Sequence, residues 1–462
     1  RRKLIPSQYT RISKPWLLIF LSIWSFFFLW WLGQYPGFFN FDTLQLLQII
    51  KDGKLSPWHS IPYSALTSLF WNLQGDLALL GLFQLSLFSF LLSSLFFAFW
   101  KSTESLTLTA SFLLLFFLSP LHGAYSLAYN RDPLYSWLFI AFLAQLFFLQ
   151  IQKPQSNKNP WTFGFSFFLV GLLCLLRLET MIILPIITLG LALKRWSLQP
   201  RRDSLVLLGS LFLFLVLIPW ALKTPLSTPR YGLTAYVNPL SFILNESPED
   251  QQRTILANYE SRIAPVIPIQ MLKDHYDPFE IPAFHRIPKD QNPTAQEWSD
   301  FQKATLAIIA SSPELYLRNR FSVFQRMMGL GEQQPYLNDA LPLEKRGNAM
   351  EGLIVKKPLI PSLGAWQKRL LLNLEQRDFG RFFHWGIGSS MGGLLFLLLG
   401  LCLFKKRPAF FWICLILGSR TLVVFLTAPA SQFKYLYSLY LFGFIAPMLL
   451  IIEGKNLRKI ET

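Results

Sequence analysis

A small set of charged and polar residues stands out because each one interrupts or directly borders an apolar stretch. Asp42, for example, lies in "QYPGFFNFDTLQLLQIIKDGKLSPWHS", residues 34–60, which follows the first apolar run. A carboxylate in such a place can remove a proton from a hydroxyl group as a general base. Cations buried nearby can hold a phosphate. The candidate residues for these two kinds of chemistry are Asp42, His59, Arg131, Asp132, Arg177, Glu179, Arg420, Lys434 and Tyr435.

The segment after Asp42 has the pattern of an amphipathic helix. Its apolar face is formed by Leu46, Leu47, Ile49 and Ile50, and its polar face by Asp42, Gln45, Gln48 and Asp52. A helix of this kind lies in the plane of a membrane interface. Asp42 is therefore a candidate base at a membrane surface. The alternative is that Asp42, or Asn40 before it, only caps the helix N-terminus.

The other ionisable residues also have two interpretations. Asp132 precedes Pro133, so it is either a site carboxylate or a helix cap. Arg177 and Glu179 interrupt "LLCLLRLETMIILPII", and an ionisable residue inside an apolar span is by default a candidate for function. The structural alternative is an ion pair between Arg177 and either Glu179 or Asp132.

Three further candidates come from later or isolated positions. Arg420 lies within "LILGSRTLVVFL", and Lys434 and Tyr435 begin the last apolar run in "APASQFKYLYSLY". His59 follows Trp58, and a lone histidine is more often a packing or hydrogen-bonding residue than a ligand. The five histidines show no zinc-ligand spacing. Asp42 and Asp132 are, however, a candidate oxygen pair for Mg²⁺ or Mn²⁺.

Composition indicates an integral membrane protein. Of the 462 residues, 52% are hydrophobic and only 15% are charged, against about a quarter charged in a soluble domain. The net charge of +17 does not form a basic stripe with stacking aromatic residues, so we expect no nucleic-acid partner. The cations lie instead in short loops between apolar spans, which is the positive-inside pattern. The first apolar run, 16–33, has no small-residue cleavage site, so we expect a span there and not a cleaved signal peptide.

The apolar runs predict an all-α polytopic protein with about ten transmembrane helices. We expect them at 16–34, 77–99, 106–120, 133–151, 162–177, 180–194, 204–222, 385–404, 408–427 and 435–452, the fifth and sixth being candidates for two halves of a hairpin within the membrane. The chain then divides into a transmembrane module at 1–222 with a first outer loop at 35–76, an extracytoplasmic helical domain at 223–384, and transmembrane helices at 385–462.

The basic loops orient these spans. With ten spans, the N-terminus, the C-terminus and the loops near Lys153, Arg201 and Lys405 fall on one side, which we expect to be the cytoplasm. Asp42, Asp132 and the 223–384 domain then face the opposite side. Within that domain, Trp298, Phe301, Leu306 and Ile309 predict one helix, and Ser312-Pro313 predicts the start of a second.

Taken together, these segments resemble the bacterial GT-C-type membrane glycosyltransferases, which use polyprenyl-phosphate sugars. The resemblance is carried by "YPGFFNFDTLQLLQIIKDGKLSPWHSIP", "NRDPLYSWL", "LLRLETMIILP", "SSPELYLRNRFSVF" and "SQFKYLYSLY". Two positions depart from the family pattern. His59 is followed by Ser60 and not by proline, and Lys434 stands where arginine is usual, although lysine cannot make the two-pronged phosphate contact of arginine.

The resemblance implies a GT-C-like fold and a site on the periplasmic face of the bacterial inner membrane. It implies that Asp42 activates the acceptor or contacts a metal, that Asp132 is a second site acid, and that the anomeric carbon inverts. The implied partners are a polyprenyl-phosphate-linked sugar, a glycan, lipid or protein acceptor, and membrane lipids. Two alternatives remain at this point: a transporter or flippase of a lipid-linked or anionic solute, and a polysaccharide polymerase or ligase.

Overall fold

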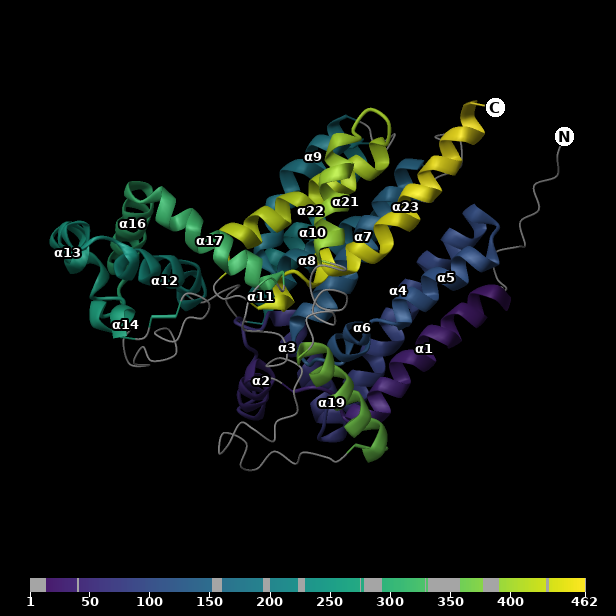
Figure 1. Cartoon of the computed structure of the whole chain (residues 1–462), viewed down its shortest axis with the longest axis horizontal. Helices are drawn as coiled ribbons and strands as arrows, with labels where there is room; N and C mark the ends of the chain where they lie inside the picture. The colour runs from purple at the N-terminus through teal and green to yellow at the C-terminus, as the bar shows by residue number, and fades with distance from the viewer. Residues whose placement is uncertain are drawn as a thin grey trace.

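The chain folds into a helical bundle with a smaller helical unit at its side (Figure 1). Within the residues that it describes, the computed structural model contains helices and one isolated backbone bridge, between Phe38 and Ala128. These residues are 14–39, 41–151, 160–193, 200–222, 229–274, 276–277, 293–328, 330, 358–376, 390–428 and 432–461.

Six helices in the described part of the chain are long and apolar enough to cross a membrane, which confirms a multi-pass all-α protein. They are α1 (Lys14–Gln34), α4 (Ala78–Thr103), α7 (Arg131–Ile151), the stretch Ser204–Ala221, α22 (Pro408–Thr427) and most of α23 (Tyr437–Glu461). Ser204–Ala221 runs through α10 (Pro200–Phe212), a π-helical turn (Leu213–Leu217) and α11 (Ile218–Ala221). Each of the six overlaps a span predicted from the sequence.

The remaining four predicted spans differ from simple membrane-crossing helices. The 106–120 run forms α5 (Leu106–Phe117) and α6 (Pro120–Ser126), which are bent by 64° relative to each other. The break is at Pro120, because proline lacks an N–H and keeps the preceding Ser119 out of helical geometry. As one span, this pair would raise the number from six to seven.

Three apolar helices are shorter than a span: Phe165–Leu176 of α8 (Pro160–Leu176), Leu178–Ala192, and α21 (Gly392–Cys402). Leu178–Ala192 consists of a 3₁₀ helix, η1 (Leu178–Ile183), followed by α9 (Leu184–Ala192). Residues 385–389 of the predicted eighth span lie outside the described residues. The total of ten spans therefore stays a prediction.

The predicted first outer loop contains two helices, α2 (Phe41–Lys51) and α3 (Ile61–Gln74). As expected, Leu46, Leu47 and Ile50 of α2 are buried, and Gln45 and Gln48 are exposed. Asn40, the alternative cap residue, lies outside the described residues.

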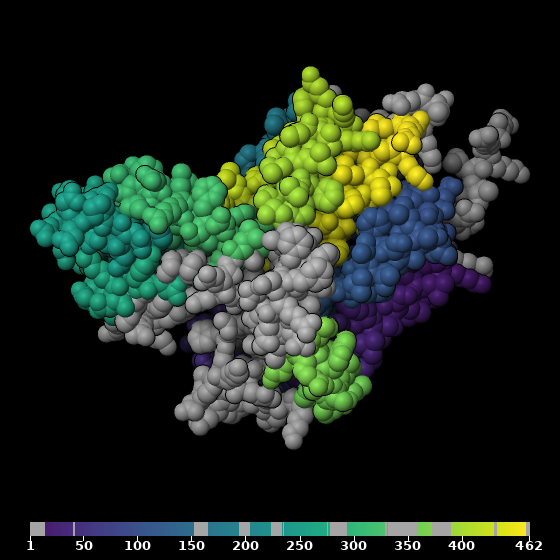
Figure 2. All heavy atoms as spheres, in the orientation of Figure 1, coloured from purple at the N-terminus to yellow at the C-terminus, as the bar shows by residue number. Residues whose placement is uncertain are grey.

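The side unit packs around its own apolar core, which includes Leu240, Ile263 and Phe301. Its helices are α12 (Pro229–Glu246), α13 (Glu249–Ile263), α14 (Ile269–Asp274), α16 (Ala295–Ser311) and α17 (Pro313–Met327). Figure 2 shows this unit as a lobe beside the bundle. The predicted break at Ser312-Pro313 is confirmed, but Leu306 is 54% exposed, and the buried face of α16 is Phe301, Ala304, Thr305 and Ile308.

Arg320 of α17 connects this unit to the end of α22. It is fully buried and donates to the carbonyl oxygen of Ala428 (2.8 Å) and to Asn238 Oδ1 (2.6 Å). The Tyr316 hydroxyl donates to the Leu426 carbonyl (2.9 Å). The carbonyls at a helix C-terminus lack partners within their helix and carry partial negative charge, so an arginine is well suited to this position. Burial lowers the pKa of Arg320 to about 10, which keeps it charged at neutral pH.

Contacts along α23 define the two ends of the bundle. Near its C-terminal end, Lys455 Nζ donates to the Thr103 carbonyl at the end of α4 (2.7 Å), and Glu453 accepts the Ala409 N–H at the start of α22 (3.0 Å). In Figure 1 the first turn of α1 lies at the right and the last turn of α23 at the upper right. Lys434 lies just before α23. At a helical rise of 1.5 Å per residue, Lys434 and Lys455 are separated by about 30 Å. The candidate residues and this basic end therefore lie at opposite ends of the bundle.

We predict that Lys54, in the first outer loop, and Lys405, after α21, face opposite sides of the membrane. Both side chains are exposed. In a background without Cys174, Cys402 and Cys414, an impermeant thiol reagent should label Lys54→Cys in intact cells and should label Lys405→Cys only after permeabilisation. Labelling of both variants in detergent is the control. If both react from outside, the predicted orientation is wrong.

Candidate functional site

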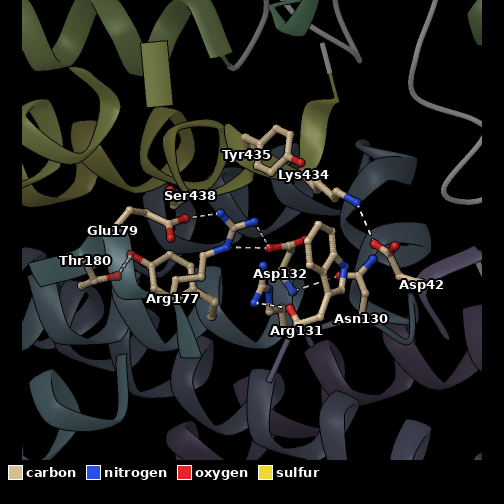
Figure 3. Close-up of polar contacts among 12 residues, drawn as sticks. Asp42, Asn130, Arg131, Asp132, Arg177, Glu179, Thr180, Lys434, Tyr435 and Ser438 are labelled. Atoms are coloured by element: carbon tan, nitrogen blue, oxygen red, sulfur yellow. Dashed lines mark hydrogen bonds and ion pairs between the residues drawn. The ribbon is translucent and has the colours of Figure 1, made fainter. Parts of the chain in front are cut away.

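Asp42 contacts Lys434, 392 residues later in the chain. Lys434 Nζ lies 2.9 Å from Asp42 Oδ2 (Figure 3). The lysine side chain is 8% exposed and the aspartate side chain 30%, so the aspartate is the more accessible partner of the pair. Helix α2 begins at Phe41, which places Asp42 inside the first turn and not at the cap position. The partial positive charge at the N-terminus of α2 also stabilises the negative charge of this carboxylate.

The segment before Asp42 is bound to the α6–α7 loop. The Phe38 N–H donates to the Leu127 carbonyl (2.9 Å), and the Tyr129 N–H donates to the Phe38 carbonyl (2.9 Å). On the other side, the Thr43 hydroxyl donates to the Tyr129 carbonyl. Gly37 has a φ of +152°, and a Cβ there would lie 2.5 Å from the Tyr129 ring, so this close approach requires glycine. These contacts fix where α2 starts and thus where Asp42 points.

Asp132 and Glu179 both pair with Arg177. Arg177 Nε donates to Asp132 Oδ1 (2.7 Å), Nη2 contacts the same oxygen, and Nη1 contacts Glu179 Oε1. Arg177 is 3% exposed. It follows α8 in extended geometry, where the helix ends and η1 begins. Both ion pairs considered from the sequence are therefore present, and they join the start of α7 to the break between α8 and η1.

The cap of α7 is a different residue from the one considered. Asn130 Oδ1 accepts the Asp132 N–H (2.9 Å), which is the bond made by an N-cap side chain. The Asp132 carboxylate is thus used for the pair with Arg177 and not for capping.

Arg420 is 1% exposed and forms no ion pair with a carboxylate in the described part of the chain. Its Nε donates to the Tyr135 hydroxyl (2.9 Å) and its Nη1 to Ser438 Oγ (2.7 Å) and to the Tyr435 carbonyl (3.2 Å). Its guanidinium lies 4.8 Å from the centroid of the Tyr135 ring. Nη2 is buried and has no hydrogen-bond partner among the described residues. Arg420 therefore has a guanidinium nitrogen that is still available as a donor, whereas each guanidinium nitrogen of Arg177 already contacts a carboxylate.

Tyr435 joins these groups. Its ring centroid lies 5.1 Å from the Arg177 guanidinium and 5.7 Å from Lys434 Nζ, and its carbonyl accepts from Arg420. A tyrosine ring close to cations stabilises them through its negative face. Burial raises the pKa of the Tyr435 hydroxyl, so it stays protonated at neutral pH.

His59 and Arg131 border the Asp42 side of the site. Arg131 Nη1 donates to the Trp58 carbonyl (2.8 Å), and His59 Nδ1 shares a hydrogen bond with Ser56 Oγ (2.7 Å). Burial lowers the pKa of His59 to about 4, against an opposing effect of the nearby Asp42 charge. The imidazole is therefore neutral at pH 7.

All nine candidate residues are brought together by these contacts, although they come from five separate segments. Four are cations (Arg131, Arg177, Arg420 and Lys434), and three are carboxylates (Asp42, Asp132 and Glu179), so the cluster has one excess positive charge. Burial on its own would raise the pKa of Asp42, but Lys434 and the other charges lower it well below its usual value. The cluster thus combines an ionised, partly exposed carboxylate with an excess of cations.

Sequence reasoning missed the neutral residues of the site. Tyr135 accepts from Arg420 and from the Thr180 hydroxyl (2.9 Å), and Ser438 accepts from Arg420. Their spacing from candidate residues could have indicated them. Tyr135 is four residues after Arg131 and shares a helix face with it, and Ser438 is four residues after Lys434.

The described residues do not fit the Mg²⁺ or Mn²⁺ site considered from the sequence. Within the described ranges, no group of three or more His, Cys, Asp or Glu side chains gathers in a way that would hold a metal ion. Asp132 is paired with Arg177, which leaves Asp42 as a single, lysine-paired oxygen donor. A cation site needs more oxygen ligands than this.

No protein-family model, curated protein or solved structure matches the chain.

We predict that Arg177 and Arg420 contribute differently to stability. Arg177→Met would leave the buried Asp132 without its cation and should cost about 3–5 kcal/mol. Arg420→Met leaves no buried carboxylate unpaired and should cost less than half as much. The free energy of unfolding in mixed micelles is the measurement, with the exposed Arg253→Met as control. Equal losses for the two variants would show that Arg420 has an equally essential structural partner.

The pKa of His59 predicts a pH dependence of stability. The unfolded chain binds a proton near pH 6.5 and the folded chain only near pH 4, so stability should fall as the pH drops through this window. Between pH 7 and pH 5 the loss should be about 2 kcal/mol. Asp42, whose pKa is lowered, titrates below this range. In His59→Gln this part of the loss should disappear. An unchanged pH dependence of unfolding in that variant would show that folding does not lower the pKa of His59.

Proposed function

We propose that this protein is a GT-C-type membrane glycosyltransferase, which moves a sugar from a polyprenyl-phosphate donor to an extracytoplasmic glycan, lipid or protein acceptor. One observation carries the proposal: Asp42, a partly exposed carboxylate, directly contacts a cation cluster at one end of a bundle of membrane-spanning helices. A lipid-linked phosphate reaches such a cluster from the bilayer, and a polar acceptor reaches Asp42 from the aqueous side.

In the proposed transfer, the residues of the site account for both the proton and the leaving group. The acceptor hydroxyl gives its proton to the Asp42 carboxylate, and its oxygen forms a bond to the anomeric carbon. The bond between that carbon and the phosphate oxygen breaks, and the electron pair leaves with the phosphate. Attack from the face opposite the phosphate inverts the anomeric carbon. Because phosphate is a good leaving group, the cations need only stabilise the charge that develops on it.

Lys434 and Arg420 are the proposed phosphate ligands. Arg177 already satisfies two carboxylates, whereas Arg420 has a buried donor nitrogen without a partner among the described residues. Lys434 bonds Asp42, and this pairing makes Asp42 a weak base because it stabilises the ionised form. A donor phosphate that draws Lys434 away would make Asp42 more basic at the moment when the donor is present. We propose that Tyr435 and Arg131 support this arrangement from either side.

The proposal also includes the side of the membrane on which the site lies. The contacts along α23 place the cluster at the end of the bundle opposite Lys455, and the basic loops suggest that the Lys455 end is cytoplasmic. The active site would then face the periplasm of a bacterial inner membrane, with residues 223–384 on the acceptor side.

A transporter or flippase remains the rival from a different class. A transport site usually lies near the middle of the membrane between two similar halves. Here the cluster is built from the first residues of α7, the end of α8 and the residues before α23. A polymerase or ligase would share the chemistry proposed for Asp42 and would differ in the acceptor.

We predict that Asp42→Asn abolishes transfer and keeps lipid-phosphate binding. Asparagine cannot accept the proton, so turnover should fall about 10²–10⁴-fold. The same change releases Lys434, so a polyprenyl monophosphate should bind as tightly as before or several-fold more tightly. Lys434→Met and Arg420→Lys should weaken that binding about tenfold, and the exposed Lys54→Met is the matched control.

The assays use protein in nanodiscs, a panel of polyprenyl-phosphate sugars for transfer, and a polyprenyl monophosphate for binding. Near-normal turnover of Asp42→Asn would contradict the role of Asp42. If no lipid phosphate binds the wild type, the glycosyltransferase proposal is wrong. Movement of a fluorescent polyprenyl phosphate across liposomes without sugar release would support the transporter.

A further inference from the structure

Helix α19 (Pro361–Gln376) is packed against the end of α1 and not against the α12–α17 unit that precedes it in the chain. Gln34 Nε2 donates to Gln367 Oε1 (2.9 Å), and Gln367 Nε2 donates to the Leu29 carbonyl (3.1 Å). The Ile360 N–H donates to the Leu32 carbonyl (3.2 Å). Leu32 is one of the last four residues of α1, whose carbonyls have no partner within the helix and need one as the chain leaves the hydrocarbon. These bonds place α19 at the level of the membrane surface, at the same end as Asp42.

The contact between the two helices is unusually close. A Cβ on Gly364 would collide with the Gly33 carbonyl, and a Cβ on Gly33 would collide with the Gln367 side chain. Small residues permit this approach, as they do between helices within membranes. Figure 1 shows α19 crossing the end of α1 instead of continuing along it, as a helix in the plane of the interface does.

The surface of α19 is amphipathic around this contact. Gly364, Gln367 and Leu371 are buried against the bundle. Successive residues of a helix are rotated by 100°, so Leu363, Trp366 and Leu370 form an apolar flank beside this buried face. Lys368 lies on the side of the helix opposite that flank. Arg369 lies next to Trp366. Trp366 and Leu359 are each 53% exposed, Ile360 is 40% exposed, and Arg369 is also exposed.

Lipid around the apolar helix α1 would account for these exposed apolar side chains. Because the apolar flank adjoins the α1 contact, lipid packed on α1 would also reach Trp366. Tryptophan is enriched at this level of membranes, and a neighbouring arginine can contact phospholipid headgroups. We propose that α19 is an interfacial helix whose Leu359–Trp366 side inserts into the phospholipid leaflet at the Asp42 end of the bundle, with Arg369 among the headgroups. This role does not depend on the proposed glycosyltransferase activity.

Nitroxide labels test the proposal in full-length protein without native cysteines, reconstituted in phosphatidylcholine and phosphatidylglycerol nanodiscs. Labels at Trp366→Cys and Leu359→Cys should collide more with oxygen than with a water-soluble nickel chelate, by a several-fold higher ratio than a label at Arg369→Cys. The Leu359 site keeps Trp366 intact, so its result does not depend on removal of the proposed anchor. Leu18→Cys on the exposed face of α1 is the lipid reference, and Glu249→Cys on α13 is the water reference.

Two results would overturn the proposal. Labels at 359 and 366 with the water-like ratio of the Glu249 reference would place α19 outside the bilayer. Labels shielded from both reagents would show that another protein surface, such as a second copy of this chain, covers the helix. Binding of polyprenyl phosphate, measured on the same samples, is expected to be unchanged, which separates this result from a failure of the proposed function.

Discussion

A buried charge within a membrane protein needs polar partners, and the pairing of Arg177 with Asp132 and Glu179 is the constraint on which the rest of this site depends. An arginine at the end of an apolar helix is costly unless its donors are satisfied. Satisfying it draws the first turn of α7 to the break between α8 and η1. Tyr435 packs near the same guanidinium, so the start of α23 is positioned as well. The pair thus assembles three chain segments before any substrate is involved.

The two arginines are both buried, but their surroundings differ. Each of the three guanidinium nitrogens of Arg177 contacts a carboxylate, while Arg420 donates to the neutral oxygens of Tyr135, Ser438 and Tyr435. Hydrogen bonds to neutral acceptors reduce the free-energy cost of burying the guanidinium, but they do not neutralise its charge. A positive potential therefore remains near Arg420 and is available to an anionic ligand.

The chain couples this site to the surfaces around it through the ends of its helices. Arg320 and Tyr316 of the α12–α17 unit bond carbonyls at the end of α22, within three turns of Arg420 on the same helix. At the other side, α19 bonds the end of α1, and the segment after α1 leads directly to Asp42. The outer helices are thus attached to the two helices whose ends border the site, so their positions and that of the site depend on each other.

The sequence by itself determined the class of the protein. Runs of apolar residues long enough for a bilayer predict spans from composition alone, and six of them are long helices here. The rarity of charge in those runs also identified Arg177, Glu179 and Arg420 as candidates. Proline chemistry predicts the break at Ser312-Pro313, whereas the apolar run at 106–120 predicts a single span that in the structure is bent at Pro120.

Only the tertiary structure decided which residues meet. Asp42 and Lys434 are 392 residues apart, so no local pattern could pair them, and the sequence left open whether Arg177 pairs with Glu179 or with Asp132. The division of roles between Arg177 and Arg420, the use of Asn130 as the cap of α7, and the contribution of Tyr135 follow from distances between helices. The packing of α19 on α1 has the same origin, because a glycine pair 331 residues apart allows close approach only once the helices have been brought together. Hydropathy is a property of each segment, whereas ion pairing and close packing are properties of the assembled chain.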